Sequence, residues 1–379
     1  MDEPTSWASF AGRLAVDVVE CIDLERAPHR LAEPGPWFVV VDFEAFGRGG
    51  RARAWRFAHV ADGGPAGASS GSAPGITSGD TWRGPEPGSW HSSMDRDAYE
   101  SAVRRVRGHV REGTVYQANV CRVLQAPLPV VRDGSAPREP AADALAARLA
   151  AGNPAPYAAA VHVPAASGVD PVWVVSASPE LYLSLDGGAL ASGPIKGTAR
   201  TPGGLTDKDR AENVMITDLV RNDLHRVCEP GTVDVIELLG VEEHPGLVHL
   251  VSRVRGALTP AVAGAPDRWG RVLRATFPPG SVSGAPKSSA LQVIDELETA
   301  TRGPYCGAVG WVDGDRAELA VGIRTFWWER GPHDDGVLRF GTGAGITWGS
   351  DPAAEWAETE LKASRLVRLA SAAGSDRRA

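Results

Sequence analysis

The chain has 379 residues, of which 43% are hydrophobic and 23% are charged, and its formal net charge is −8. This length and hydrophobic fraction are enough to bury a large core. The negative charge argues against nucleic acid as a partner, because no basic stripe is available to neutralise phosphates. It also means that an anionic substrate would need local positive charge to overcome a repulsive overall field.

Four cysteines, Cys21, Cys121, Cys228 and Cys306, are widely spaced and include no C-x-x-C pair. This spacing indicates neither a zinc site nor a disulfide framework, so we expect reduced thiols in the core. The N-terminus begins Met-Asp-Glu without a signal-like apolar stretch, and no apolar run approaches membrane-spanning length. We therefore expect a cytoplasmic protein with no membrane partner.

The first 93 residues are predicted to form a β-rich segment, with strand-like runs at 37–43 and 54–60. Within it, residues 62–89 are dominated by Gly, Ala, Ser and Pro, which predicts a flexible surface loop with no packed core. Residues 94–373 form a larger unit that we expect to be integrated with the first. We expect helices from Ser93 or Asp95 to about Arg111 and at 141–151, 207–224, 266–274, 288–300 and 351–372, and strands at 305–312, 317–327 and 337–347. This mixture predicts an α+β fold with large antiparallel sheets.

A hairpin is predicted where two apolar alternating runs, 181–185 and 189–195, flank the breaker Asp186-Gly187-Gly188. Folding back about Gly187 brings Glu180 to within a rung or two of Lys196. A surface ion pair is the ordinary interpretation of such a pair. The alternative is that Lys196, at a strand end inside the Gly-bounded segment 194–198, is a nucleophile.

Acidic residues stand three apart on two predicted helices, Asp209 with Glu212 and Glu355 with Glu358, so each pair shares a helix face. Taken alone, such pairs are usually solvated surface. Lys362 follows Glu358 by four residues, which is typical of a helix ion pair. His249 lies in an alternating segment, where a lone histidine is more often a core residue than a functional one.

Several long motifs occur in one order: PIKGT (194–198), AENVMITDLVRNDL (211–224), VHLVSRVRG (248–256), FPPGSVSGAPK (277–287), RGPYCGAVGW (302–311), GIRTF (322–326) and GTGAGITWGSDPAAEWAETELKA (341–363). In this order they resemble the chorismate-utilising enzymes over roughly residues 95 to 370. The resemblance implies that family's fold, a large antiparallel β-sandwich flanked by helices, and makes 94–373 the chorismate-binding catalytic domain.

The resemblance also implies a set of site residues. It matches Glu212 and Glu358 to the family's Mg²⁺ ligands, with Asp209 and Glu355 acting largely through water. Magnesium suits such a site, because it takes few protein carboxylates and leaves positions for water and a substrate carboxylate. The resemblance implies that Arg324, on a predicted strand, binds the side-chain carboxylate of the substrate and that Tyr305 assists it. It places Thr198 near the ring, and the backbone at Gly343 and Gly345 and the side chain of Lys362 facing the substrate. It also implies that Ser281 and Lys287 lie beside a closing loop and that His249 takes part in proton transfer.

Two positions within the family indicate which reaction to expect. The residue before Gly197-Thr198 is lysine in aminodeoxychorismate synthase component I and usually alanine in anthranilate synthase component I. Gln117 lies where relatives that add water have a lysine base, and glutamine cannot serve as a base. Ala199 departs from the family pattern, so Arg200 is given no role.

The resemblance therefore implies Mg²⁺-dependent amination of chorismate at C4. Lys196 attacks C2 while Glu180 protonates the departing hydroxyl, and ammonia then expels the lysine. Neutral amine and neutral acid must coexist, although ordinary pKa values favour the ion pair by about six units. Burial must shrink that difference, and we expect the two groups to share one proton.

Ammonia needs a source, because the chain has no recognisable glutaminase nucleophile, and Cys228 does not lie in a Gly-rich elbow. We therefore expect a separate glutaminase subunit and a product for 4-aminobenzoate, either in folate synthesis or in a specialised pathway. The alternatives are anthranilate synthase component I, 2-amino-2-deoxyisochorismate synthase, or a catalytically inactive homologue that regulates a partner.

Overall fold

The computed structural model describes residues 6–62, 81–132, 137–199, 201–244 and 247–372. All strand pairs between named elements of this part of the chain are antiparallel. The strands are β1 (Trp7–Phe10), β2 (Arg13–Asp23), β3 (Trp37–Val41), β4 (Ala52–Asp62), β5 (His91–Ser92), β6 (Gln117–Pro127), β7 (Tyr157–Val163), β8 (Val172–Ser178), β9 (Leu181–Asp186), β10 (Ala189–Gly193), β11 (Ile195–Ala199), β12 (Asp234–His244), β13 (Leu247–Ala257), β14 (Gly284–Ala285), β15 (Ala308–Asp313), β16 (Arg316–Val321), β17 (Thr325–Arg330) and β18 (Gly336–Ile346).

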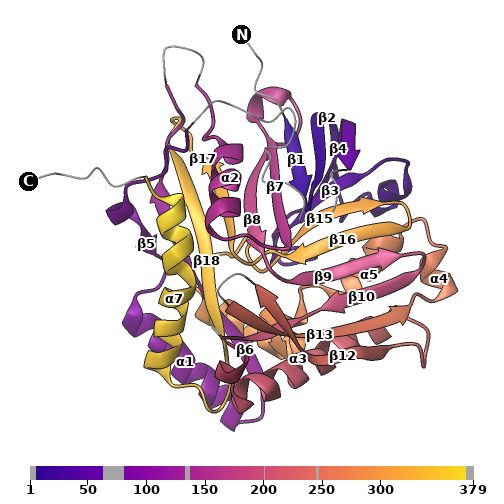
Figure 1. The fold of residues 1–379 in the computed structure, drawn as a ribbon, viewed down its shortest axis with the longest axis vertical. Coiled ribbons are helices and arrows are strands. Elements are labelled where there is room, and N and C mark those ends of the chain that lie inside the picture. Colours follow the sequence, from indigo (N-terminus) through magenta and orange to yellow (C-terminus); the bar gives the residue numbers. More distant parts are fainter. Residues whose placement is uncertain (1–5, 63–80, 133–136, 200, 245–246, 373–379) are drawn as a thin grey trace, which may run out of the picture.

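Strand pairing forms one long path that folds into two groups (Figure 1). The first group runs β6–β18–β17–β8–β7–β1–β2, and the second runs β4–β3–β15–β16–β9–β10–β13–β12, with β11 also on β13. The pair β2–β4 joins the two groups. The predicted fold class, a large antiparallel sheet structure flanked by helices, is confirmed.

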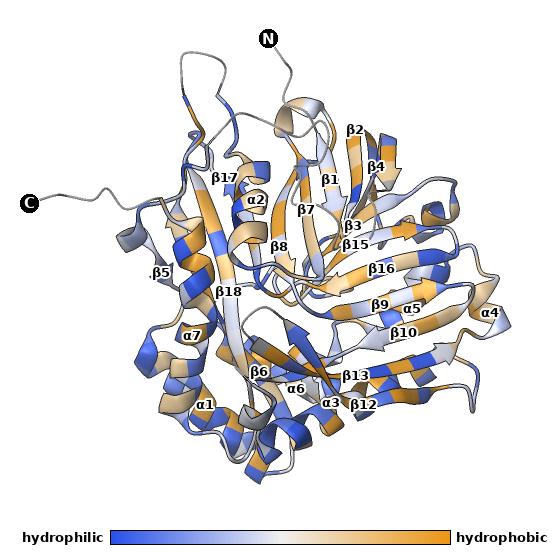
Figure 2. Cartoon of the chain, viewed as in Figure 1, coloured by the Kyte–Doolittle hydropathy of each residue, from blue (hydrophilic) through white to orange (hydrophobic). Residues whose placement is uncertain are grey.

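Helices cover the outer faces of both groups. Helix α7 packs on β18 and against α1, whereas α3 packs on β11, β12 and β13 (Figure 1). The alternation of apolar and polar residues along these helices is visible in Figure 2, as expected for helices with one buried face. The helices are α1 (Arg96–Arg111), α2 (Ala142–Gly152), α3 (Asp207–His225), α4 (Pro260–Ala263), α5 (Arg268–Thr276), α6 (Lys287–Leu297) and α7 (Pro352–Ala370). None of the helices in the described residues is long and apolar enough to cross a membrane.

The N-terminal segment shares its sheet and core with the rest of the chain. Strand β3 pairs with β15, and β1 pairs with β7. Of the predicted flexible loop at 62–89, residues 63–80 lie outside the described residues. The prediction is wrong for its end, because Trp82 is buried and its indole N–H donates to the carbonyl oxygen of Ala370 at 2.7 Å.

The predicted helices agree with the structure within a few residues, and local chemistry explains their ends. Asp95 caps α1 by accepting a hydrogen bond from the N–H of Ala98. The predicted strand at 317–327 is wrong, because it divides into β16 and β17. Arg324 lies in the break with a φ of 53°, so it is not on a strand as predicted.

Candidate active site

Lys196 lies in an irregularity of β11. The strand pairs with β13 through Ile195 opposite Val251 and Thr198 opposite His249, and the register shifts between these two pairs. Gly197 has a φ of 92°, and a Cβ there would lie 2.8 Å from Cβ of Asp209. Residues 196–197 therefore form a bulge, which is a common way to redirect a side chain near an active site.

The amine of Lys196 reaches the other group of strands. Its Nζ lies 3.1 Å from the point that a Cβ on Gly345 would occupy, and Nε2 of Gln117 lies 2.5 Å from the same point. Gly345 is on β18 and Gln117 is on the paired strand β6. Lys196 Nζ makes no hydrogen bond or ion pair with any described residue. The lysine is thus held between two sheets with its amine available to a ligand.

Glu180 lies next to this lysine and is 4% exposed. Its carboxyl group accepts hydrogen bonds from the Ser281 hydroxyl and from the N–H of Ile195. Burial raises the pKa of Glu180 from its ordinary 4.5 to about 7, although the two hydrogen bonds and the charge of Lys196 oppose the rise. The predicted proximity of Glu180 and Lys196 is confirmed.

The structure does not show a proton shared directly between Glu180 and Lys196. Within the described residues, no hydrogen bond joins Glu180 to Lys196, and no ion pair within 4.0 Å does so. The carboxyl group is turned toward Ser281 and the backbone instead. Glu180 and Lys196 are therefore neighbours that no direct hydrogen bond joins.

The carboxylates of Glu212, Glu355 and Glu358, which come from two helices, lie near one another and near Lys208. Lys208 Nζ lies 3.6 Å from Oε1 of Glu212 on α3 and 3.5 Å from Oε1 of Glu355 on α7. Burial raises the pKa of Glu212. Burial also acts to raise the pKa of Glu358, but the charges of Lys362, Lys196 and Lys208 hold it below the ordinary value.

The chemistry of these residues would suit a magnesium ion that also binds water and a ligand oxygen. Oε1 of Glu212 is buried and has no hydrogen-bond partner among the described residues, which leaves an anionic oxygen for a cation. No three His, Cys, Asp or Glu side chains in the described ranges could hold a metal ion by themselves. Magnesium is commonly bound by one or two carboxylates with waters, so a closed protein cage is not required.

Asp209 has a structural partner. Its Oδ2 accepts hydrogen bonds from the N–H and the hydroxyl of Thr206, at 2.8 and 2.6 Å, and so completes a capping box at the start of α3. This contact anchors the helix that carries Glu212. The role predicted for Asp209, a water-mediated contact to magnesium, stays a prediction.

Lys362 forms the helix ion pair that its spacing predicted, whereas its predicted substrate-facing role stays a prediction. Its Nζ lies 2.6 Å from Oε1 of Glu358, which is the expected helix ion pair. The same atom donates to the carbonyl oxygen of Gly343 at 3.1 Å. Lys362 therefore links α7 to the glycine-rich part of β18.

Arg324 projects from the break between β16 and β17. Burial and the nearby charge of Arg365 lower the pKa of its guanidinium group. No carboxylate in the described part of the chain pairs with it. Two neighbouring cations without an anion between them make a suitable place for a substrate carboxylate.

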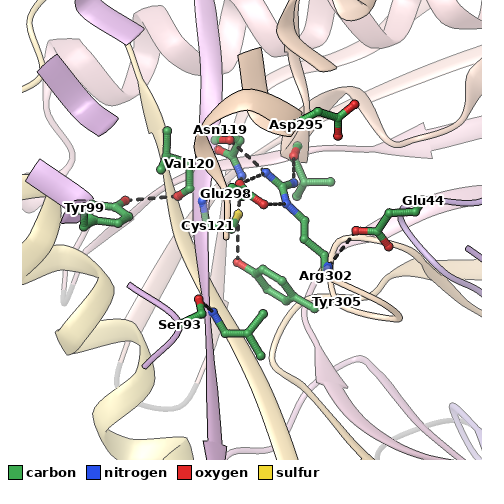
Figure 3. Close-up of polar contacts among 12 residues, drawn as sticks. Glu44, Ser93, Tyr99, Asn119, Val120, Cys121, Asp295, Glu298, Arg302 and Tyr305 are labelled. Carbon is green, nitrogen blue, oxygen red and sulfur yellow. Dashed lines mark hydrogen bonds and ion pairs between the residues drawn. The ribbon is translucent and has the colours of Figure 1, made fainter. Parts of the chain in front are cut away.

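Among the described residues, no hydrogen bond joins the Tyr305 hydroxyl to Arg324. Its hydroxyl lies 3.8 Å from Sγ of Cys121, as Figure 3 shows, and its ring covers Gly341. The structure thus places Tyr305 beside Cys121 and Gly341, and its predicted role of assisting Arg324 stays a prediction.

The remaining predicted residues divide between site and framework. His249 is buried and lies opposite Thr198 in the β11–β13 pair. Lys287 is not directed at the site, because its Nζ donates to Oδ2 of Asp223 and to the carbonyl oxygen of Thr276, both at 2.7 Å. Lys287 therefore anchors the loop that carries Ser281.

Sequence reasoning missed Lys208, Asn213 and Arg365. Lys208 stands four residues before Glu212, a spacing that predicts contact on a helix. Nothing local indicates that Lys208 also reaches Glu355 or that Arg365 lies near Arg324, since those partners come from distant elements. A separate cleft of about 600 Å³, lined by residues such as Arg51, Trp173 and Trp327, includes none of the predicted site residues.

Comparisons with known proteins agree with this architecture. Residues 2–368 match the model of a family described as chorismate binding enzyme. Over 293 residues, 73% of this chain and 53% of the relative, the chain is 39% identical to an anthranilate synthase component 1 of Haloarcula marismortui. Over 297 residues, 73% of this chain and 59% of the relative, it is 35% identical to aminodeoxychorismate synthase component 1 of Klebsiella aerogenes. The chain spans about half the length of the relatives it matches.

Solved structures share the fold. A putative 2,3-dihydroxybenzoate-specific isochorismate synthase from Bacillus anthracis has a TM-score of 0.74 at 21% identity, covering 97% of both chains. Anthranilate synthase component I from Streptococcus pneumoniae has a TM-score of 0.70 at 22% identity, covering 97% of this chain and 91% of that one. By its sequence match over residues 2–368, this chain belongs to the chorismate-binding enzyme family.

Proposed function

We propose that this chain aminates chorismate at C4 to give 4-amino-4-deoxychorismate, with ammonia supplied by a separate glutaminase subunit. The observation that carries the proposal is the position of Lys196. Its amine lies over Gly345, where the described residues offer it no hydrogen-bond partner, and Glu180 lies nearby with a pKa of about 7. A nucleophile and an acid are thus available together in one half-buried site.

Lys196 and Glu180 account for the bonds that form and break in the first step and for the proton that is transferred. The neutral amine of Lys196 forms a bond to C2 while the ring double bonds shift and the C4–O bond breaks. The hydroxyl leaves as water with the proton of Glu180. Ammonia then forms a bond to C4, the double bonds return, and the amine of Lys196 leaves C2. The reaction requires the ring to lie within reach of both Glu180 and Lys196.

Other residues bind and orient the substrate. Arg324, with Arg365 nearby, would hold the side-chain carboxylate, and Ser281 keeps Glu180 oriented. Glu212 and Glu358 would hold Mg²⁺, with Glu355 and Asp209 acting through water, and the ion would supply positive charge for the ring carboxylate. Gln117 presents a buried side-chain oxygen that has no partner among the described residues, and it offers no base to activate water.

A second candidate is anthranilate synthesis, which is the activity named for the Haloarcula and Streptococcus relatives. It requires ammonia to reach C2. Lys196 speaks against it, because its amine would occupy the approach to that carbon. The same objection applies to 2-amino-2-deoxyisochorismate synthesis.

The product decides between these reactions. Incubation with chorismate, Mg²⁺ and excess ammonium ion should give 4-amino-4-deoxychorismate without release of pyruvate. The product is identified by its mass and by conversion to 4-aminobenzoate with a lyase. Anthranilate as the principal product would overturn the proposal, and so would chorismate that remains unconsumed. Glutamine alone should be inert as the nitrogen donor.

A further inference from the structure

We propose that Asn213, a buried residue of α3, is a positioning residue for Lys196, because its side-chain amide holds the bulge from which the lysine projects. The inference rests on the proposed function only for the role that it gives to Lys196. Asn213 is 1% exposed and cannot contact the substrate directly.

The bulge leaves backbone groups that need another partner. Regular pairing between β11 and β13 stops at Ile195–Val251 and resumes, after a register shift, at Thr198–His249. Buried carbonyl groups that lose their partner in a ladder cost stability unless another donor reaches them. Nδ2 of Asn213 lies 2.9 Å from the carbonyl oxygen of Leu250 and 3.5 Å from that of Lys196. One amide group thus joins the two strands where their own hydrogen bonds are interrupted.

The surroundings of Asn213 fix the direction of its amide. Its Oδ1 accepts a hydrogen bond from the hydroxyl of Ser252 at 2.5 Å and lies 3.4 Å from that of Thr217. The Ser252 oxygen in turn accepts from the N–H of Leu239 at 3.1 Å, so its own proton is free to point at Asn213. The Thr217 hydroxyl donates mainly to the backbone carbonyl oxygen of Asn213, at 2.7 Å. The Ser252 donor on one side and the carbonyl acceptors on the other favour one orientation of the amide.

The backbone of Lys196 matters for the position of its amine. Lys196 Nζ has no hydrogen bond or ion pair within the described ranges, so its position depends on its backbone and on packing against Gly345. Asn213 also directly follows Glu212, a predicted ligand of magnesium. Helix α3 therefore sets the position of the nucleophile and of the carboxylate together, and a displacement of about 1 Å can cost about a hundredfold in rate.

Two variants remove the amide in different ways. Asn213→Ala removes both donor and acceptor. Asn213→Asp keeps the shape and the oxygen that Ser252 approaches but removes the amide donor, so it tests the contact to Lys196 even if the alanine variant folds poorly. Ile216→Val is the control, because it removes one methyl group from the buried face of the same helix without touching the bulge.

Hydrogen exchange of the peptide containing residues 195–199 tests the positioning role directly. Both Asn213 variants should exchange there at least about tenfold faster than wild type, and Ile216→Val should not. Unchanged protection in both variants would overturn the inference. This measurement does not depend on the reaction catalysed, so it remains decisive if the product proves to be anthranilate and the proposed function fails.

Kinetics supply the second measurement. At saturating chorismate, Mg²⁺ and ammonium, both Asn213 variants should lose about tenfold or more in kcat, while KM for chorismate changes less than about threefold. If Asn213 had only a structural role, its variants would lose active protein as Ile216→Val does. The formation of a chorismate adduct on Lys196 would then not be slowed. Normal kcat in a variant with faster exchange would also contradict a positioning role.

Discussion

Lys287 and Lys196 are both half-buried lysines, but their ammonium groups have opposite surroundings. Lys287 donates to Asp223 and to the carbonyl oxygen of Thr276. Lys196 has no such partner in the described residues and stands over the backbone of Gly345. An amine that forms no hydrogen bond or ion pair within the protein remains available to a ligand.

The same contrast separates two glutamates. Glu298 is 7% exposed, and its carboxylate accepts from the guanidinium group of Arg302 and from the N–H of Cys121 (Figure 3). Glu212 is half-buried, and its Oε1 has no hydrogen-bond partner in the part of the chain that the structure describes. These two glutamates therefore differ in how far the hydrogen bonds of their oxygens are satisfied.

The largest expected effect comes from making one substitution at both lysines. Lys196→Ala should lower C4 amination by about a thousandfold or more, because the covalent route is lost, while the unfolding midpoint changes little. Intact-protein mass after adding chorismate without ammonia should show an adduct on wild type and none on Lys196→Ala.

Lys287→Ala is the matched control for that experiment. It leaves Asp223 buried without its partner and should cost about 3–5 kcal/mol of unfolding free energy, but the protein that stays folded should still form the adduct. An equal adduct on Lys196→Ala, or full C4 amination by that variant, would show that Lys196 is not the nucleophile. The contrast between Lys196 and Lys287 would then carry no functional meaning.

The two glutamates allow a similar test of the metal site. Glu212→Gln should abolish activity at low Mg²⁺ while changing stability by less than about 1 kcal/mol, since no hydrogen bond of its Oε1 is lost. Glu358→Gln should lose activity in the same way, although it also removes the ion pair with Lys362. Glu298→Gln should instead lower stability by about 3 kcal/mol and leave the Mg²⁺ dependence unchanged. Near-normal turnover of the first two variants at low Mg²⁺ would refute the metal assignment.

The raised pKa of Glu180 predicts how stability depends on pH. The folded state binds this proton more tightly than the unfolded state, so stability falls as pH rises from about 4.5 to about 7, by up to about 3 kcal/mol. Denaturant unfolding at pH 5 and pH 8 should show that Glu180→Gln loses this part of the dependence. A difference between wild type and variant that does not change with pH would mean that Glu180 titrates normally.

The same pKa sets the pH dependence of activity. The reactive pair, neutral Lys196 and neutral Glu180, carries one proton in all. Below about pH 7 the Glu180 acid and the Lys196 ammonium group together carry two titratable protons. Therefore kcat/KM should rise with pH and level off near pH 7. A profile that falls across this range would contradict the proposed protonation states.

The smallest effect is expected at a glycine. Gly345→Ala places a methyl group 2.5 Å from Nε2 of Gln117 and 3.1 Å from Nζ of Lys196, so one of them must move. Turnover should fall by about ten- to a hundredfold with little loss of stability. Gly349→Ala, where nothing lies within 4 Å, should behave as wild type. Equal activity of the two variants would show that the position of the Lys196 amine is not critical.

Local sequence determined those features whose partners lie within a few residues. The cap at Asp95, the helix pair Glu358–Lys362 and the return of the chain about Gly187 follow from spacing and turn chemistry. The proximity of Glu180 and Lys196 belongs here too, because one short hairpin sets it.

Only the tertiary structure decided which side chains lie near a residue distant in sequence and which remain without a hydrogen-bond partner. Lys196 lies over Gly345 because strands about 150 residues apart in sequence are brought together, and Lys208 reaches Glu355 because α3 and α7 converge. No local pattern encodes such distances, because they depend on how two sheets and their helices pack. The break at Arg324 has the same origin, since its backbone has a left-handed conformation and its carbonyl accepts from the N–H of Ala177 in β8. Alternating residues at 317–327 predict one continuous strand, whereas the left-handed backbone at Arg324 separates β16, which pairs with β9, from β17, which pairs with β8.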